Sequence, residues 1–185
     1  MGYFKPKIIT FANALIAMVT MIRLARKDDL PEIMLIFEKA REFMRNSGNP
    51  DQWINGYPSG EIITEDIRNG NFYVEEINGV ISGCFAFIVG PEPTYREING
   101  EWLSPSPYGT IHRLASAGIV GGVADRCIKF CRKIISNLRA DTHEQNILMQ
   151  NLLVRNGFRY CGEIRVANGS KRLAYQLPSL DSPSE

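Results

Sequence analysis

The chain has 185 residues, 44% of them hydrophobic and 22% charged, which is the size and composition of one globular domain with a sizeable core. Lysine and arginine total 21 against 20 aspartate and glutamate residues, so the net charge is +1. Because its positive and negative charges nearly cancel, the chain has no net electrostatic field that would attract nucleic acid or an anionic membrane surface. Neither is expected as a partner.

The N-terminus carries an apolar run, Ile8 to Ile22, behind two lysines, which has the pattern of a short signal segment. It is too short to span a bilayer comfortably. A second, self-consistent opening starts at Met21, where a strand pattern leads into a helix cap. We therefore predict an N-terminal extension over residues 1–20, a working domain over 21–177 and a flexible Ser/Pro tail over 178–185.

The first half of the domain predicts one strand, two amphipathic helices and a hairpin. The hairpin is indicated by Asn78-Gly79 between two apolar runs, because Asn-Gly supplies the positive φ angles of a tight turn. The expected elements are strands over 22–25, 71–77 and 80–89 and helices from Asp28 or Asp29 to about Ser47 and from Ser59 to Arg68.

The second half begins with a long excursion over residues 90–107, predicted from its prolines and from Asn99-Gly100. The elements expected after it are a strand over 108–116, a helix from Val123 with an apolar stripe reaching Leu138, a strand over 138–142, a helix over 145–156 and strands over 158–166 and 172–177. The predicted order is βααβββαβαββ.

The four cysteines, Cys84, Cys127, Cys131 and Cys161, form no CxxC pair, and two of them are four residues apart on a predicted helix face. This spacing suits burial better than a zinc site, so no metal is expected. We predict reduced thiols and a cytoplasmic location. A disulfide framework is the alternative, but nothing else in the sequence indicates secretion.

A turn rich in glycine, with Gly118, Gly121 and Gly122, lies between the strand 108–116 and the helix that starts at Val123. The first amides of a helix lack internal partners, and together with the helix dipole they favour an anion. We therefore predict a pyrophosphate-binding turn, although glycines at such a place also serve only to make the turn. Neither a P-loop nor a GxGxxG pattern is present.

The segment Asp141 to Arg159 closely resembles motif B of the GNAT superfamily of acyl-CoA N-acyltransferases. In that family an Asn follows a strand, a small or apolar residue comes three positions later, and the helix runs into Gly-Phe. The matching residues are Asn146, Met149, Gly157 and Phe158. The turn 118–123 resembles motif A, Gln/Arg-x-x-Gly-x-Gly/Ala, with a full match only at Gly121, because Gly118 and Val123 replace the usual residues.

The resemblance covers about residues 21–177 and implies an α/β (α+β) fold. This fold has a mixed, mostly antiparallel central sheet that splays between its fourth and fifth strands, with helices on both faces. The gap would hold acetyl-CoA as co-substrate. The implied cofactor-binding residues are Leu114, Ala115 and Ser116 along the pantetheine, Gly118, Gly121, Gly122 and Val123 at the pyrophosphate, and Asn146 on the pantetheine arm.

The resemblance also implies an N-acetyltransferase that acetylates a primary amine of a small molecule by direct attack in a ternary complex. Direct attack needs a neutral amine, an oxyanion donor and an acid for the leaving thiolate. His112 is the candidate base, because it lies on the strand before the turn and titrates in the useful range. A structural histidine beside Arg113 is the competing interpretation. Leu153 stands where many members carry the Tyr that protonates the thiolate.

The acceptor-binding segment of the family corresponds to the stretch between the first two helices, where Trp53 and Tyr57 are the candidate substrate-binding residues. Loop aromatics also commonly pack onto the core. Trp102 and Tyr108, which flank part of the long excursion, are expected to form the opposite wall. The sequence leaves open the acceptor amine, the acyl chain length and the oligomeric state, a homodimer included.

Two other functions are compatible with parts of the sequence. The first is a non-catalytic acyl-CoA-binding or sensing domain on the same fold, motivated by Leu153 and the altered motif A. The second is a thiol hydrolase that uses Cys131 or Cys161 with His112 or His143. The hydrolase is disfavoured because a thiol on an apolar helix face is poorly activated.

Overall fold

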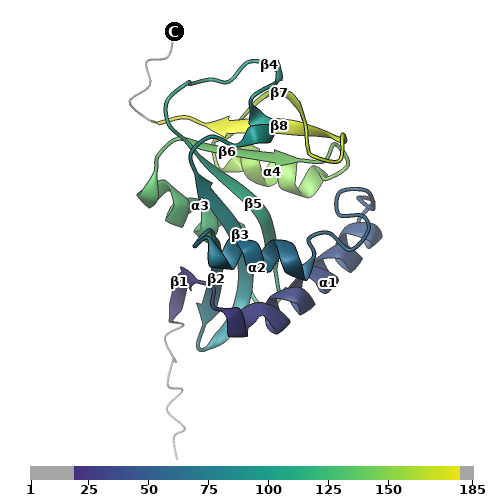
Figure 1. The fold of residues 1–185 in the computed structure, drawn as a ribbon, viewed down its shortest axis with the longest axis vertical. Helices are drawn as coiled ribbons and strands as arrows, with labels where there is room; N and C mark the ends of the chain where they lie inside the picture. Colours follow the sequence, from purple (N-terminus) through teal and green to yellow (C-terminus); the bar gives the residue numbers. More distant parts are fainter. Residues whose placement is uncertain (1–18, 180–185) are drawn as a thin grey trace, which may run out of the picture.

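One mixed β-sheet with helices on both faces makes up the computed structural model, which describes residues 19–179 (Figure 1). The predicted extension over 1–20 and the tail over 178–185 lie almost entirely outside the described residues. The strands are β1 (Thr20–Leu24), β2 (Phe72–Ile77), β3 (Val80–Val89), β4 (Asn99–Gly100), β5 (Gly109–Ser116), β6 (Leu138–Thr142), β7 (Arg159–Arg165) and β8 (Lys171–Leu177). The helices are α1 (Leu30–Asn46), α2 (Gly60–Arg68), α3 (Val123–Ile134) and α4 (Ile147–Arg155), with short 3-10 turns η1 (Lys27–Asp29) and η2 (Pro93–Tyr95).

The strand order is β1-β2-β3-β5-β6-β8-β7-β4, and every neighbouring pair is antiparallel except β5 with β6. That parallel pairing covers only Gly109–Ile111 against Leu138–Ala140. Beyond it, β5 continues to Ser116 along β3, while β6 continues along β8. The sheet therefore opens between β5 and β6, as expected for the fourth and fifth strands of the predicted order. In Figure 1, β6–β8 and α4 lie above this opening and β1–β3 with α1 lie below it.

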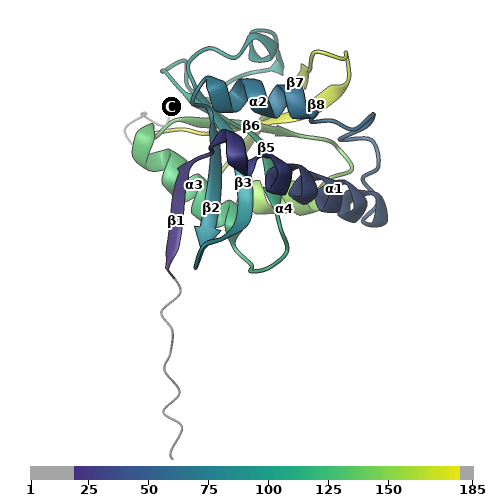
Figure 2. The ribbon, with the colours of Figure 1, turned by 60° about the horizontal axis from the view of Figure 1, so that its bottom comes forward.

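The two faces of the sheet carry separate cores. Helices α1 and α2 cover one face, and α3 and α4 cover the other (Figure 2). Because successive side chains of a strand point to opposite faces, β3 serves both cores. Cys84 and Ala86 pack with Phe37 and Ile63 on the first face, whereas Phe85 packs with α3 on the second.

Two details differ from the predicted elements. Helix α3 ends at Ile134, so Leu138 does not belong to its apolar stripe; Leu138 begins β6, where a strand over 138–142 was also predicted, and is fully buried. Asn99-Gly100, expected only as a turn, forms β4 and pairs with β7. Glycines at both Gly100 and Gly162 permit this close approach, since a Cβ at Gly100 would collide with the Cys161 carbonyl.

No helix within residues 19–179 combines the length and the apolar character that crossing a membrane requires.

Candidate active site

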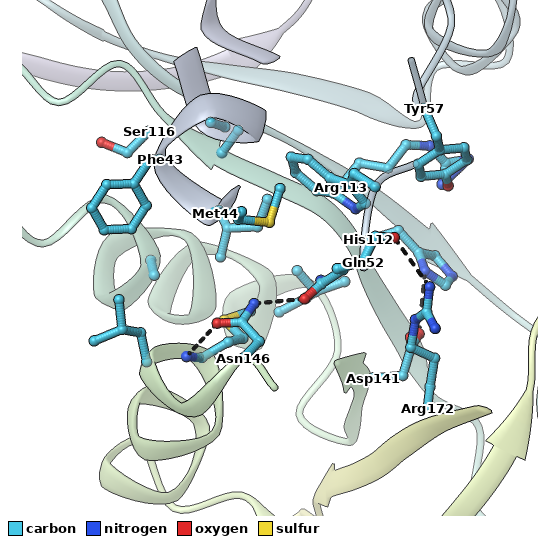
Figure 3. A pocket seen from close by; sticks show the side chains of 18 of the residues that line it. Phe43, Met44, Gln52, Tyr57, His112, Arg113, Ser116, Asp141, Asn146 and Arg172 are labelled. Atoms are coloured by element: carbon cyan, nitrogen blue, oxygen red, sulfur yellow. Dashed lines mark hydrogen bonds and ion pairs between the residues drawn. The ribbon is translucent and has the colours of Figure 1, made fainter. Parts of the chain in front are cut away.

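A cavity of about 870 Å³ opens where β5 and β6 separate. Its wall comes from α1, the α1–α2 loop, β5, the start of α3, the end of β6, α4 and the β7–β8 turn (Figure 3). The predicted site residues in this wall are Trp53, Tyr57, His112, Leu114, Ala115, Ser116, Gly118, Val123 and Asn146. Gly121 and Gly122 lie in the adjoining turn, outside the wall itself. The fold thus gathers residues from distant parts of the sequence around one space.

The turn before α3 presents a run of free backbone amides. Among the described residues, no amide from Ile119 to Asp125 donates a hydrogen bond to a protein acceptor, and the first to do so is Arg126 N, which donates to Gly122 O at 3.1 Å. Gly122 caps α3 with a left-handed φ of 81°. Free amides at a helix N-terminus match the chemistry of a phosphate or pyrophosphate group.

The Arg126 guanidinium lies beside this turn, and sequence reasoning missed it. Its Nη1 donates to Gly121 O at 2.9 Å, while Nε and Nη2 pair with the buried carboxylate of Glu75. The hydrogen bond to Glu75 raises the pKa of Arg126. Nothing in the sequence marks Glu75 as buried, so only the folded chain reveals the pair.

A bulge interrupts β5 at the cavity wall. Ala86 of β3 pairs with His112 and Cys84 pairs with Ala115, so the ladder leaves Arg113 and Leu114 without partner residues. Arg113 has a φ of 53°, an unusual value for a residue other than glycine. A bulge of this kind frees backbone groups and re-aims side chains. The Leu114 amide is therefore a candidate donor to an oxyanion in the cavity.

His112 lies between two carboxylates in the cavity wall, and Figure 3 shows one of them, that of Asp141, near the ring. Its Nε2 is 3.4 Å from Glu92 Oε2, and its Nδ1 is 3.8 Å from Asp141 Oδ1. The hydrogen bond from His112, with its charge, lowers the pKa of Glu92 to about 2. Each carboxylate thus faces one ring nitrogen, and the imidazole can donate to both of them only in its protonated form.

Asp141 is held in place by two further groups. Its Oδ1 accepts a hydrogen bond from the Tyr95 hydroxyl at 2.7 Å, and its Oδ2 is 3.9 Å from Arg172 Nε. Burial raises the pKa of Tyr95 well above its ordinary value, so the phenol remains a donor. Glu92 and Tyr95 both belong to the 90–107 excursion, which has no periodic pattern, and sequence reasoning therefore did not select them.

Asn146 caps the N-terminus of α4 and uses both ends of its side-chain amide. Its Oδ1 accepts from Met149 N at 3.1 Å, and its Nδ2 donates to Gln52 Oε1 at 2.7 Å. Gln52 Oε1 also accepts from Asn49 and Thr142, so the α1–α2 loop is tied to the far side of the opening. One amide hydrogen of Asn146 is left for a ligand such as the expected pantetheine arm.

The predicted aromatic residues divide into two groups. Trp53 meets Phe37 edge-on at 5.4 Å and also lines the cavity, as Tyr57 does. Trp102 and Tyr108 do not line it. They hold the Arg139 guanidinium between their rings, 3.9 and 3.8 Å from the ring centroids, and so belong to the packing under the excursion. The expected opposite wall is supplied instead by Glu92, Thr94 and the turn 166–168.

The remaining candidates have structural surroundings. Leu153 is buried in the core, so no phenol stands at that position. All four cysteines are free and buried, and burial raises the pKa of the Cys161 thiol, which disfavours a thiol hydrolase. His143 accepts a hydrogen bond from Gln145 N at 3.3 Å in the turn before α4. Among residues 19–179, no cluster of His, Cys, Asp and Glu is arranged to hold a metal ion.

No family model matches the sequence, and no curated protein matches it. Several solved structures are similar to this chain. An acetyltransferase of the GNAT family from Streptococcus agalactiae is 34% identical, with a TM-score of 0.75, covering 86% of this chain and 95% of the other. A GNAT-family acetyltransferase from Listeria monocytogenes is 23% identical, with a TM-score of 0.65 and coverages of 85% and 93%.

N-acetylglutamate synthase from Neisseria gonorrhoeae, solved in complex with coenzyme A and N-acetyl-glutamate, has the same fold over part of its length. It is 22% identical, with a TM-score of 0.55, and the match covers 86% of this chain but 35% of that protein.

Proposed function

Because this chain belongs to the GNAT family of acetyltransferases, we propose that it transfers an acetyl group from acetyl-CoA to a primary amine of a small molecule by direct attack in a ternary complex. The observation that carries the proposal is one continuous cavity, which begins beside the free amides before α3 and ends at His112 between two carboxylates. Its two ends suit a pyrophosphate and an amine respectively.

The residues present fit acetyl-CoA. The amides of 119–125 and the nearby Arg126 would hold the pyrophosphate, and the β5 segment Leu114–Ser116 would lie along the pantetheine. Gly118 and Val123 flank that path in the wall, with Gly121 and Gly122 beside it. Asn146 lies across the opening on α4. When bound, acetyl-CoA supplies an acyl group whose C–S bond breaks as the new C–N bond forms.

Residues of the chain would remove the amine proton and stabilise the charge that develops during the reaction. In this proposal His112 takes the proton from the attacking amine, and the flanking Glu92 and Asp141 stabilise the imidazolium that results. The Leu114 amide, free of ladder pairing, would donate to the thioester oxygen as negative charge develops there. With Leu153 in the core, the thiolate would take its proton from water. Trp53 and Tyr57 would contact the acceptor.

Release of free coenzyme A thiol, measured with a panel of primary amines, tests the proposal. We expect acetyl-CoA to bind and at least one amine to raise thiol release well above hydrolysis, with the acetyl group recovered on the amine nitrogen. Tight acetyl-CoA binding without amine-dependent release on a broad panel would overturn the assignment and favour a sensing domain.

A further inference from the structure

The acceptor end of the cavity holds a cation directly beside the candidate base. We propose that the acceptor is an amine that carries a carboxylate close to its amino group, the chemistry of an amino acid, and that Arg113 binds this carboxylate. The inference rests on the proposed function and narrows its substrate class. It also assigns a specificity-determining role to Arg113.

The first support is the backbone at Arg113. In a regular strand the side chains of residues 112 and 113 point to opposite faces. Here the bulge and the φ of 53° at Arg113 break that alternation, and both residues line the cavity. In Figure 3 the side chains of His112, Arg113 and Tyr57 lie on one side of the view and Ser116 on the other. A strained left-handed residue at a ligand cavity is a recognised sign of function.

The second support is the state of the Arg113 guanidinium. Its Nε is 3.0 Å from Asp66 Oδ2, and its Nη2 donates to Asp66 Oδ1 at 3.3 Å. In the described part of the chain Nη1 has no acceptor, and neither Nε nor Asp66 Oδ2 forms a well-aligned hydrogen bond. The side chain is only 13% exposed. A guanidinium buried with a spare donor matches a carboxylate, which it can bind with directional N–H bonds.

Tyr57 gives the anion a second donor. Its side chain lines the cavity, and burial raises the pKa of its phenol, with Arg113 acting in the opposite direction. The phenol therefore keeps its proton at neutral pH. One guanidinium N–H and one phenol O–H are a suitable pair for the two oxygens of a carboxylate.

The acceptor end of the cavity places an unpaired carboxylate next to the base and spare hydrogen-bond donors one residue further along β5. Arg172 lies beside Asp141 and Arg113 beside Asp66, so these two pairs are close to neutral. Glu92 accepts hydrogen bonds from Thr94 and faces His112, and within residues 19–179 no lysine or arginine pairs with it, which leaves a negative charge next to the base. An ammonium group fits beside Glu92, and a carboxylate fits at the spare donors of Arg113 and Tyr57. An anionic group next to Glu92 would be repelled, and an acceptor without a carboxylate would leave the spare donors without a partner.

The competing explanation is that Arg113 only ties β5 to α2 through Asp66. To separate the two, thiol release should be measured with each common amino acid, with its amide and with the amine that lacks the carboxyl group. We expect the free acid of at least one side-chain class to have a kcat/KM about tenfold or more above its two uncharged relatives, mainly through KM.

The double variant Arg113→Asn/Asp66→Asn should bring this ratio toward one. Asn tolerates the left-handed backbone, and removing Asp66 avoids an unpaired buried carboxylate. Arg68→Asn, an exposed change on α2, is the control and should leave the ratio as it is. Melting curves of all proteins monitor folding.

Each result has one meaning. No turnover with any acceptor would contradict the proposed function itself. Turnover without a preference for the carboxylate would overturn this inference and leave the proposed function standing. A native preference retained in the folded double variant, or an equal loss for all three kinds of acceptor, would overturn the role of Arg113.

Discussion

His112 illustrates how surroundings give an ordinary side chain a specific chemical capacity. The imidazole alone is a weak indication of a base, since many histidines are structural. In the fold its two nitrogens face Glu92 and Asp141, and Asp141 is in turn bound by Tyr95. Removal of a proton from the amine requires a base, and the two carboxylates are placed to stabilise the charged form of this one.

We expect His112→Gln to lower kcat by about 10²- to 10⁴-fold, the usual contribution of a general base. Affinity for acetyl-CoA, measured by calorimetry, should change little because His112 lies at the acceptor end. Unchanged turnover between pH 6 and 9 would remove His112 from the mechanism.

Glu92 should also affect acid stability. Its folded pKa, about 2, lies below the ordinary 4.5, so its contribution is fully present above about pH 4.5 and is lost as the pH falls toward 2. Glu92→Gln should therefore destabilise the protein at pH 7, and the difference from wild type should shrink below pH 4.5. Urea unfolding at several pH values checks this; a constant difference would contradict it.

At the scale of elements, the start of each helix beside the opening has a defined task. The amides before α3 are left free, whereas the start of α4 is satisfied by Asn146, which also joins Gln52. One helix end is thus open to a ligand, and the other is occupied by the chain itself. The difference follows from the cap residues, Gly122 without a side chain and Asn146 with one.

Loss of the Asn146 cap should destabilise α4. We expect Asn146→Ala to lower the free energy of unfolding by about 1 kcal/mol, because Met149 N loses its acceptor. Asn146→Ser keeps a capping oxygen but loses the amide donor, so it should recover most of the stability without recovering acetyl-CoA affinity. Equal stability of the two variants would mean that the cap contributes little.

The turn before α3 can be tested without disturbing the fold. A side chain at Gly121 meets open space, and this glycine has no positive φ. Gly121→Glu should therefore fold normally but weaken acetyl-CoA binding, by roughly tenfold, because its charge repels phosphate. Gly121→Ala is the control for bulk. Native affinity of the Glu variant in calorimetry would argue against a pyrophosphate site here.

At the scale of the whole molecule, the two halves of the sheet share, within residues 19–179, only the short β5–β6 pairing. The cavity lies between them, and its wall takes residues from both. A ligand bound there adds contacts across this short pairing. Gln52 is the chain's own bridge over that opening, through Asn146 and Arg172.

Acetyl-CoA at about 100 times its Kd should stabilise the protein by about 2.7 kcal/mol. For a domain of this size the melting temperature should rise by roughly 5–10 °C. Hydrogen exchange should slow most at the diverging ends of β5 and β6. If the melting temperature rose but hydrogen exchange slowed only in other parts of the protein, the ligand would bind outside this cavity.

The sequence by itself determined the order of the main elements, the hairpin at Asn78-Gly79 and the family, through the segment Asp141 to Arg159. These features depend on local periodicity, turn chemistry and short spacing, which a single chain displays. Only the tertiary structure decided that Glu92 meets His112, that Arg126 pairs with Glu75, and that Trp102 packs on Arg139 instead of lining the cavity.

The physical reason is the range of the contacts. Glu92 reaches the site from an excursion without periodic pattern, and the pairing of Arg126 with Glu75 joins residues far apart in the chain. The bulge that re-aims Arg113 arises from the register of β3 against β5, which no local pattern specifies. Local rules fix the elements, and long-range pairing fixes which side chains share a cavity.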